Sequence, residues 1–151
     1  MFAPKNILVP TDFSKYSDAA LKKAVDIASQ YDSKISLLHV MAMSEQIQQC
    51  AIDYCLSSEV VKQLEKETVK ASNDRLKKEV AAIVKSKKIK VAFDIKKGTP
   101  AEVILREQKA KKIDLIVIAS HGKTGILKQL MGSVADKVVK GAKCPVIVVK
   151  P

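Results

Sequence analysis

Residues 114–122 read DLIVIASHG, and this stretch decides the fold class. The run at 114–119 is apolar and rich in β-branched residues, as in a strand that is covered on both faces of a parallel sheet. Small and polar residues follow it at once. After a loop, Gly132 and Ser133 open a helical pattern that stops near Gly141, which fits a C′ residue. A strand, a loop and a helix in this order are part of a βαβ unit.

Four more short apolar runs alternate with helical patterns. They lie at 6–10, 34–40, 89–95 and 145–149. The first and last of these are apolar throughout, so we expect both to be buried on both faces, like 114–119. The run at 89–95 alternates, which favours a strand near an edge. The alternation predicts an α/β fold, with an open five-stranded parallel sheet and helices on both faces.

The helices carry start signals and apolar stripes. The first has a stripe from Ala20 to Ala28, and Ser14 or Ser17 can cap its start. Thr99 fits an N-cap, followed by Pro100 at the first helical position and Glu102 closing a capping box. A long helix is predicted from about 59 to 87. Its expected inward residues are Leu64, Thr68, Ala71, Val80, Ile83 and Val84.

Composition limits the classes of function. The 151 residues are enough for about one domain, and we predict a single domain over 1–151. The net charge of +11 favours anionic partners, but the lysines are spread along the whole chain. Solvated helix ends and turns explain them, and nucleic acid is not an expected partner. Aromatic residues make up 4% of the sequence and Trp is absent, which argues against a surface on which the bases of single-stranded nucleic acid stack.

The cysteines and the termini indicate a cellular location. Cys50, Cys55 and Cys144 do not have the spacing of a metal site. No apolar run approaches the roughly 20 residues of a membrane helix, and the N-terminus lacks the pattern of a secretory signal. We therefore expect a cytoplasmic protein with no protein-bound metal site and no membrane contact. The least patterned stretch, 43–58, is expected to hold a short extra helix.

Ligands of open α/β sheets bind beyond the carboxyl ends of the strands, at the switch point in strand order. The residues that follow the strands, and those that open the last helix, are therefore the candidate site. They are Pro10, Thr11, Asp12, Val40, Ala119, Ser120, His121, Gly122, Gly132, Ser133 and Val134.

The last part of this set suits an anion. A helix N-terminus presents unpaired N–H groups and a partial positive charge, and glycine lets a phosphate come close to the backbone. Gly122, Gly132 and Ser133 can together hold an anion without a lysine. Asp12 has two interpretations: it accepts a hydrogen bond from an adenine amino group or a ribose hydroxyl, or it caps the following helix. The sequence leaves both open.

Several segments together resemble the universal stress protein family. They are VPTDFS at 9–14, LLHV at 37–40, IVIASHGKTG at 116–125, GSV at 132–134 and CPVIVV at 144–149. The family's nucleotide signature is Gly, two residues, Gly, nine residues, Gly, then Ser or Thr. Gly122, Gly132 and Ser133 match it, and Ala119 takes the place of the first glycine.

The resemblance implies the strand order 3-2-1-4-5 and a bound ATP, with Mg²⁺. It implies adenine near Asp12 and Val40, and ribose near Pro10 and Ala119. The phosphates would lie on Gly122 and on the helix start at 132–134. It further implies a homodimer that pairs the last strands, here 144–150, and an unidentified protein partner.

Other motifs are excluded by single residues. Gly122-Lys123-Thr124 looks like the end of a P-loop, but Val117 stands where that motif needs glycine. His121 has no accompanying nucleophile pattern for a catalytic base, and His39 fits a hydrogen-bonded core residue. The leading hypothesis is an ATP-binding regulatory protein of the stress response, in which ATP orders the loop at 123–131. The alternatives are an interaction protein that needs no nucleotide and a slow ATP hydrolase.

Overall fold

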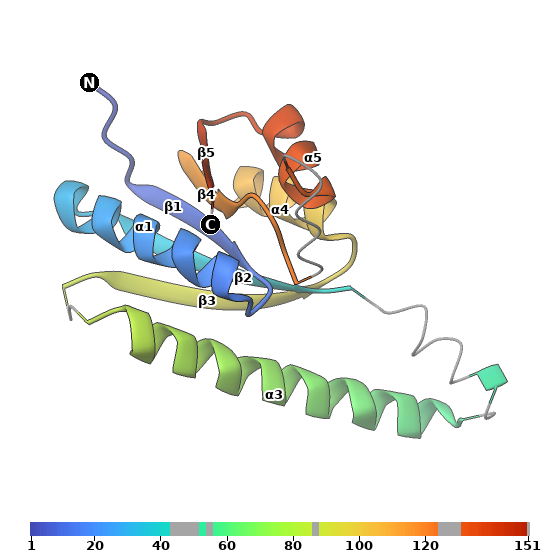
Figure 1. Ribbon diagram of the computed structural model, residues 1–151. Coiled ribbons are helices and arrows are strands. Elements are labelled where there is room, and N and C mark those ends of the chain that lie inside the picture. The colour runs from blue at the N-terminus through green and yellow to red at the C-terminus, as the bar shows by residue number, and fades with distance from the viewer. Residues whose placement is uncertain (43–51, 54–55, 86–87, 124–130, 151) are drawn as a thin grey trace.

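The computed structural model describes residues 1–42, 52–53, 56–85, 88–123 and 131–150 (Figure 1). The strands are β1 (Asn6–Thr11), β2 (Lys34–Met41), β3 (Lys90–Lys97), β4 (Leu115–Ala119) and β5 (Val146–Val149). The helices are α1 (Lys15–Tyr31), α3 (Ser58–Ile83), α4 (Pro100–Ala110) and α5 (Ser133–Gly141). The strands form one parallel sheet in the order β3-β2-β1-β4-β5, which confirms the predicted fold class and strand order.

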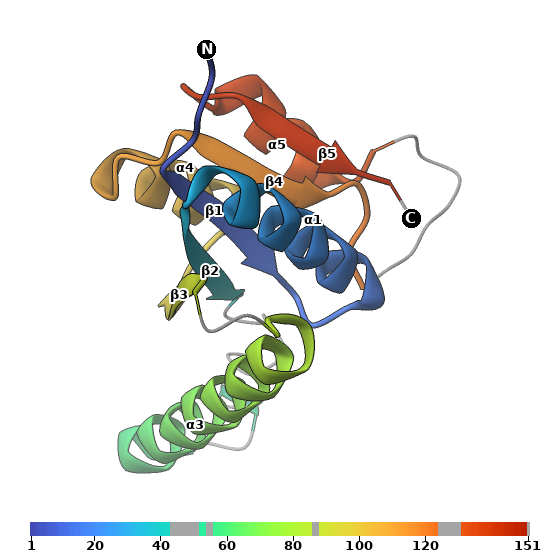
Figure 2. The same cartoon turned by 90° about the vertical axis from the view of Figure 1, so that its left-hand side faces the viewer.

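Helices cover both faces of the sheet. Side chains alternate along β1, so that Ile7 and Val9 pack with α1 and α3, while Leu8 packs with α4 and α5. Figure 2 shows α1 in front of the strands and α4 and α5 behind them. Two apolar cores result, one on each face, and β1 contributes to both because its side chains alternate between two covered faces.

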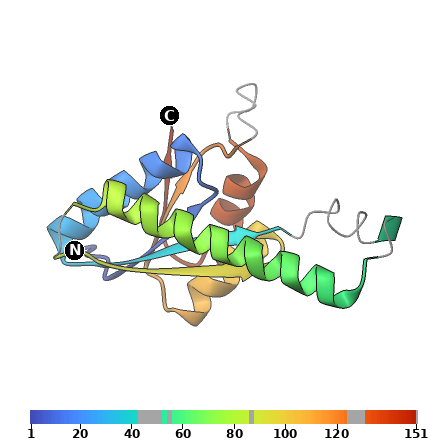
Figure 3. The same cartoon turned by 90° about the horizontal axis from the view of Figure 1, so that it is seen from below.

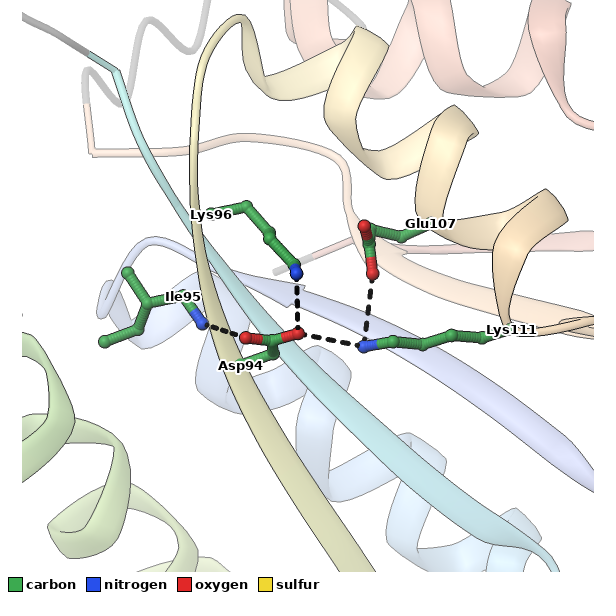
Figure 4. Close-up of polar contacts among 5 residues, drawn as sticks. All are labelled: Asp94, Ile95, Lys96, Glu107 and Lys111. Atoms are coloured by element: carbon green, nitrogen blue, oxygen red, sulfur yellow. Dashed lines mark hydrogen bonds and ion pairs between the residues drawn. The ribbon is translucent and has the colours of Figure 1, made fainter.

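The two edges of the sheet differ in character. β3 forms one edge, as its alternating pattern predicted. The ion pairs of Asp94 with Lys96 and Lys111, at 3.3 Å each, and of Lys111 with Glu107, at 3.2 Å, lie at this edge (Figure 4). Charged side chains of this kind keep a sheet edge from pairing with another chain.

β5 forms the other edge and is less buried than expected. The prediction that 145–149 is covered on both faces is wrong, because no residue of β5 is fully buried and Ile147 is 37% exposed. An apolar β-branched run indicates that a strand needs cover, but it does not say which chain supplies the cover.

The long helix α3 is displaced from its predicted face. Leu64 is 43% exposed, and Thr68 and Ala71 are exposed as well, so their inward assignment is wrong. Figures 1 and 3 show that the first half of α3 extends beyond the ends of β2 and β3, where no sheet lies beneath it. Its buried positions begin at Ser72 and continue at Leu76 and Glu79. Val80, Ile83 and Val84 are half-buried, in the predicted direction.

The predicted helix starts hold in outline. Ser14 is the N-cap of α1 and accepts from the Ser17 N–H at 3.2 Å. Thr99 is the N-cap of α4 and Pro100 follows it, but Thr99 makes no side-chain cap bond, so the capping box is wrong.

The end of α5 also differs from the prediction. Gly141 is its last helical residue rather than C′. A Cβ at Gly141 would lie 2.5 Å from Leu105 Cδ1, so glycine here allows α4 and α5 to pack closely.

Some expectations lie outside the described residues. They concern Cys50 and Cys55, most of the stretch 43–58, the end of the long helix at 86–87 and most of the loop 123–131. No helix within the described ranges is both long enough and apolar enough to cross a membrane.

Candidate functional site

A pocket of about 470 Å³ opens at the carboxyl ends of β1, β2 and β4. Its volume falls in the range of about 300–1,000 Å³ that is usual for small-molecule sites. Every residue that the sequence singled out as a candidate lines it: Pro10, Thr11, Asp12, Val40, Ala119, Ser120, His121, Gly122, Gly132, Ser133 and Val134. The structure thus brings together residues from three strands and from the start of α5.

The strand order explains why the pocket is here. β1 pairs with β2 on one side and with β4 on the other. The chain leaves β1 for α1 on one face of the sheet, and after β4 it continues to α5 on the other face. The two connections separate at this point, and a crevice remains between them.

Asp12 joins the two connections. Its Oδ1 accepts from the Ser14 N–H at 3.0 Å, and its Oδ2 accepts from the Lys123 N–H at 2.7 Å. Burial alone would raise the pKa of Asp12, but hydrogen bonds from Ser14, Lys123 and Ser17 outweigh burial and lower the pKa below its usual value. Asp12 is therefore an ionised acceptor at neutral pH. The N-cap of α1 is Ser14, so Asp12 is not the cap itself.

The two glycines of the site have different neighbours. A Cβ on Gly122 would lie 2.8 Å from Asp12 Oδ2, so glycine leaves room for the carboxylate. A Cβ on Gly132 would lie 3.1 Å from the Ser120 carbonyl oxygen, which accepts from the Gly132 N–H at 2.6 Å. Gly132 has a φ of −69°, so the close approach of α5 to β4, and not a left-handed backbone, is what favours glycine.

Two candidate side chains are already engaged. The Thr11 hydroxyl binds Glu79 of α3 and Ser17 of α1, on the face of the sheet away from α4 and α5. Only the rest of Thr11 is left to face the pocket. Ser120 is fully buried, and its hydroxyl lies 2.9 Å from His121 Nδ1.

His39 is the hydrogen-bonded strand residue that was expected. Its Nδ1 lies 2.9 Å from the Thr11 carbonyl oxygen, which can only accept, so Nδ1 carries the proton. Burial, followed by the positive charges of Lys123 and Arg75, lowers the pKa of His39, although the Thr11 carbonyl and the charge of Asp12 act in the opposite direction. The ring is therefore neutral at physiological pH.

Sequence reasoning missed part of the lining. The additional residues are Ser17, Leu38, Ala42, Pro100, Ile104, Ile118, Lys123 and Ala135. Leu38 of β2 and Ile118 of β4 could have been found, because their side chains lie on the same face of the sheet as Val40. Pro100 and Ile104 could not, because no motif of the strand ends says that α4 packs across β2. Within the described ranges, no group of three His, Cys, Asp or Glu residues could hold a metal ion.

The fold and the pocket together define a class of protein: open parallel α/β sheets with a site at the switch point. Within this class, the chain belongs to the universal stress protein family, whose pattern matches residues 4–150. Universal stress protein MJ0531 of Methanocaldococcus jannaschii is 35% identical over 146 residues, which cover 97% of this chain and 82% of that protein.

Among the solved structures that resemble the whole chain are the following two. That of MJ0577, also from Methanocaldococcus jannaschii, has a TM-score of 0.84 and 29% identity and covers 99% of this chain and 98% of that one. The universal stress protein UspA from Lactobacillus plantarum has a TM-score of 0.79 and 26% identity, and covers 96% of this chain and 97% of that one.

Proposed function

We propose that this protein is an ATP-binding regulatory member of its family, and that the pocket beyond β1, β2 and β4 is the nucleotide site. One observation carries the proposal. An ionised acceptor, Asp12, and the open N-terminus of α5 at Ser133 line the same pocket, with apolar side chains between them. An adenine nucleotide needs this combination: an acceptor for its base or sugar, an apolar wall, and N–H donors for its phosphates.

We place the base near Asp12 and Val40 and the ribose near Pro10 and Ala119. The phosphates would lie on Gly122 and the first turn of α5, at 132–134. The macrodipole of α5 favours negative charge there.

The family match over 4–150 supports a single domain over 1–151, and a cytoplasmic location stays a prediction.

Two proteins of the same fold have been solved with adenine nucleotides. One is a universal stress protein in complex with cAMP, with a TM-score of 0.63 and 22% identity. The other is a universal stress protein from Archaeoglobus fulgidus in complex with dAMP, with a TM-score of 0.59 and 20% identity. At these identities the likeness concerns the fold. It supports an adenine nucleotide as the class of ligand to test first.

Mg²⁺ would arrive with the nucleotide. Since the described residues hold no ready group of three metal-binding side chains, we place the ion on the phosphate oxygens, with most of its other ligands supplied by water. Mg²⁺ is commonly bound in this way in nucleotide sites.

The first test uses the protein as purified. Denaturation followed by chromatography should release ATP or AMP, and protein stripped of nucleotide should bind added Mg-ATP. The variant S133A should bind ATP more weakly, because it removes a donor beside the phosphates. S29A removes a hydroxyl from the exposed side of α1 and is the matched control. No released nucleotide together with no binding at millimolar Mg-ATP would refute the proposal.

We further propose a homodimer that pairs the β5 edges. β5 leaves an apolar edge that is partly exposed, whereas charged side chains border the β3 edge. Ile147 on β5 and Phe93 on β3 are each 37% exposed, so they make a matched pair. I147K should convert a dimer to a monomer in sedimentation, and F93K should leave the mass unchanged. A monomeric wild-type protein would contradict the dimer.

A further inference from the structure

A buried acid on α3 contacts the strand end that carries the site. Glu79 is 9% exposed, and its Oε1 and Oε2 lie 3.0 and 3.1 Å from Thr11 Oγ1. Thr11 is the last residue of β1 and directly precedes Asp12. A carboxyl group is costly to bury unless it is hydrogen-bonded, and here the Thr11 hydroxyl supplies the bond.

The Thr11 hydroxyl is the centre of a small network around Asp12. It accepts from the Phe13 N–H at 3.1 Å and lies 3.1 Å from Ser17 Oγ. Ser17 Oγ in turn donates to the Ser14 carbonyl at 2.9 Å. Thr11 and Phe13, which precede and follow Asp12, are therefore linked by a hydrogen bond to the Thr11 hydroxyl. Glu79 of α3 holds that hydroxyl in place.

A second contact from α3 holds the same turn. Phe13 has a φ of 63°, which is strained for an aromatic residue and persists only where neighbours fix it. The Arg75 guanidinium lies 4.1 Å from the centre of the Phe13 ring, and the His39 ring centre lies 4.4 Å away on β2. Arg75 and Glu79 are one helical turn apart, so one face of α3 contacts the turn twice.

We propose that Glu79 is a positioning residue of the nucleotide pocket, and that its carboxyl group sets the position of Asp12 through the Thr11 hydroxyl. Nucleotide affinity then depends on whether Glu79 carries a proton. This inference rests on the proposed nucleotide function and adds α3 to the elements that control it.

Both protonation states of Glu79 satisfy the network. As a carboxylate, Glu79 accepts the Thr11 proton. As an acid, it donates to Thr11 Oγ1, the Thr11 proton turns to Ser17 Oγ, and Ser17 still donates to the Ser14 carbonyl. The shift reorients hydroxyl protons and leaves no group unpaired. The turn can therefore exist in two hydrogen-bonded states.

The charges around Glu79 set the direction of the effect. Burial, together with the negative charge and a side-chain hydrogen bond of Asp18 on α1 and the negative charge of Asp12 beyond β1, raises the pKa of Glu79 to about 7 against the opposing hydrogen bond from Thr11. Loss of the Glu79 proton therefore adds a negative charge that is felt at Asp12, on the pocket side of the same turn. Affinity should fall as pH rises through 7.

The experiment compares ATP dissociation constants of the full chain across pH. E79Q stays neutral and retains a donor to Thr11, so it should bind as the wild type does at pH 6. At pH 8 it should keep this affinity and bind more tightly than the wild type. E79L should bind about tenfold more weakly. The exposed E67Q on the same helix is the matched control and should follow the wild-type pH profile. Equal affinity of E79L and wild type, or identical pH profiles of E79Q and wild type, would overturn the proposal.

A double-mutant cycle tests the route through Thr11. If Glu79 acts through this hydroxyl, T11V and E79L should each weaken ATP binding. The double variant should then bind ATP with the same affinity as the single variant that binds it less tightly. Additive losses would overturn the route.

A measurement without ligand separates this proposal from the nucleotide function. The amide signals of Ser14 and Lys123, which both donate to Asp12, should shift with a midpoint near pH 7 in wild type and stay flat in E79Q. If no variant binds ATP but these shifts occur, the nucleotide function fails and the link stands. If the wild-type signals are flat, the link fails.

Discussion

Asp12 connects the turn after β1 to the backbone after β4, and Gly122 lies against its carboxylate. A side chain at Gly122 must therefore displace either the carboxylate or the loop. We expect G122A to lose the Lys123 hydrogen bond and to weaken ATP binding by about tenfold, the cost of misplacing one charged hydrogen bond. Titration calorimetry measures this directly.

The matched control is another tightly packed glycine far from the pocket. In G141A the new methyl meets only the flexible end of Leu105, so stability changes but ATP affinity does not. Equal affinities of G122A and the wild type would show that the Asp12 contact does not matter for binding.

Glu79 also makes stability depend on pH. Its pKa of about 7 in the folded protein lies above its ordinary value of 4.5. Between these values the folded state holds a proton that the unfolded state has lost, so this contribution to stability is full below pH 4.5 and is lost by about pH 7. The free energy of unfolding of E79Q, relative to wild type, should rise by about 2–3 kcal/mol from pH 4.5 to pH 8. Urea denaturation at both pH values measures it, and a constant difference would contradict the raised pKa.

At the scale of elements, α5 offers its N-terminus to the pocket. A carboxylate there interacts well with the helix dipole but occupies the place proposed for the phosphates. S133D should therefore raise the free energy of unfolding by about 0.3–1 kcal/mol without nucleotide, and abolish ATP binding. The control is S133N, because asparagine has the size of the introduced aspartate but carries no charge. Unchanged affinity in S133D would place the phosphates elsewhere.

The face of α3 shows where sequence reasoning failed. An apolar stripe can be traced through Leu64, but the half of α3 that carries it extends beyond the sheet, and only the later half is covered. We expect L76A to cost about 2–5 kcal/mol, as for a buried leucine, and L64A to cost much less. Thermal or chemical unfolding of the two variants compares them. A similar cost at both positions would contradict the observed face.

The prediction that β5 is buried on both faces failed for a related reason. Its composition indicates that it needs cover, yet its place at the edge follows from strand order, which periodicity does not contain. The residues after β1 and β4 were found because a general rule links strand ends to sites in parallel sheets. Pro100 and Ile104 of α4, and the contact of Glu79 with Thr11, depend on packing between distant elements, and no local pattern predicts them.

At the scale of the whole molecule, the sheet divides the protein into two sides that meet at the turn after β1. α4 and α5 build the pocket on one side, and α1 and α3 hold the Asp12 turn from the other. The second half of α3 therefore contacts the strand end beside the pocket, while its first half extends past the sheet (Figure 1) and is tied to the end of β3 by the Lys97–Glu65 ion pair at 2.7 Å.

The nucleotide site is tested most directly by a map of backbone amide shifts on titration with Mg-ATP and, separately, with adenosine. ATP should shift the amides of Gly122, Gly132, Ser133 and Val134 together with those near Asp12, Val40 and Ala119. Adenosine, which lacks phosphates, should shift the amides near Asp12, Val40 and Ala119 but not those of Gly132, Ser133 and Val134. Saturable shifts elsewhere, or no shifts at millimolar ATP, would contradict the assignment of this pocket as the nucleotide site.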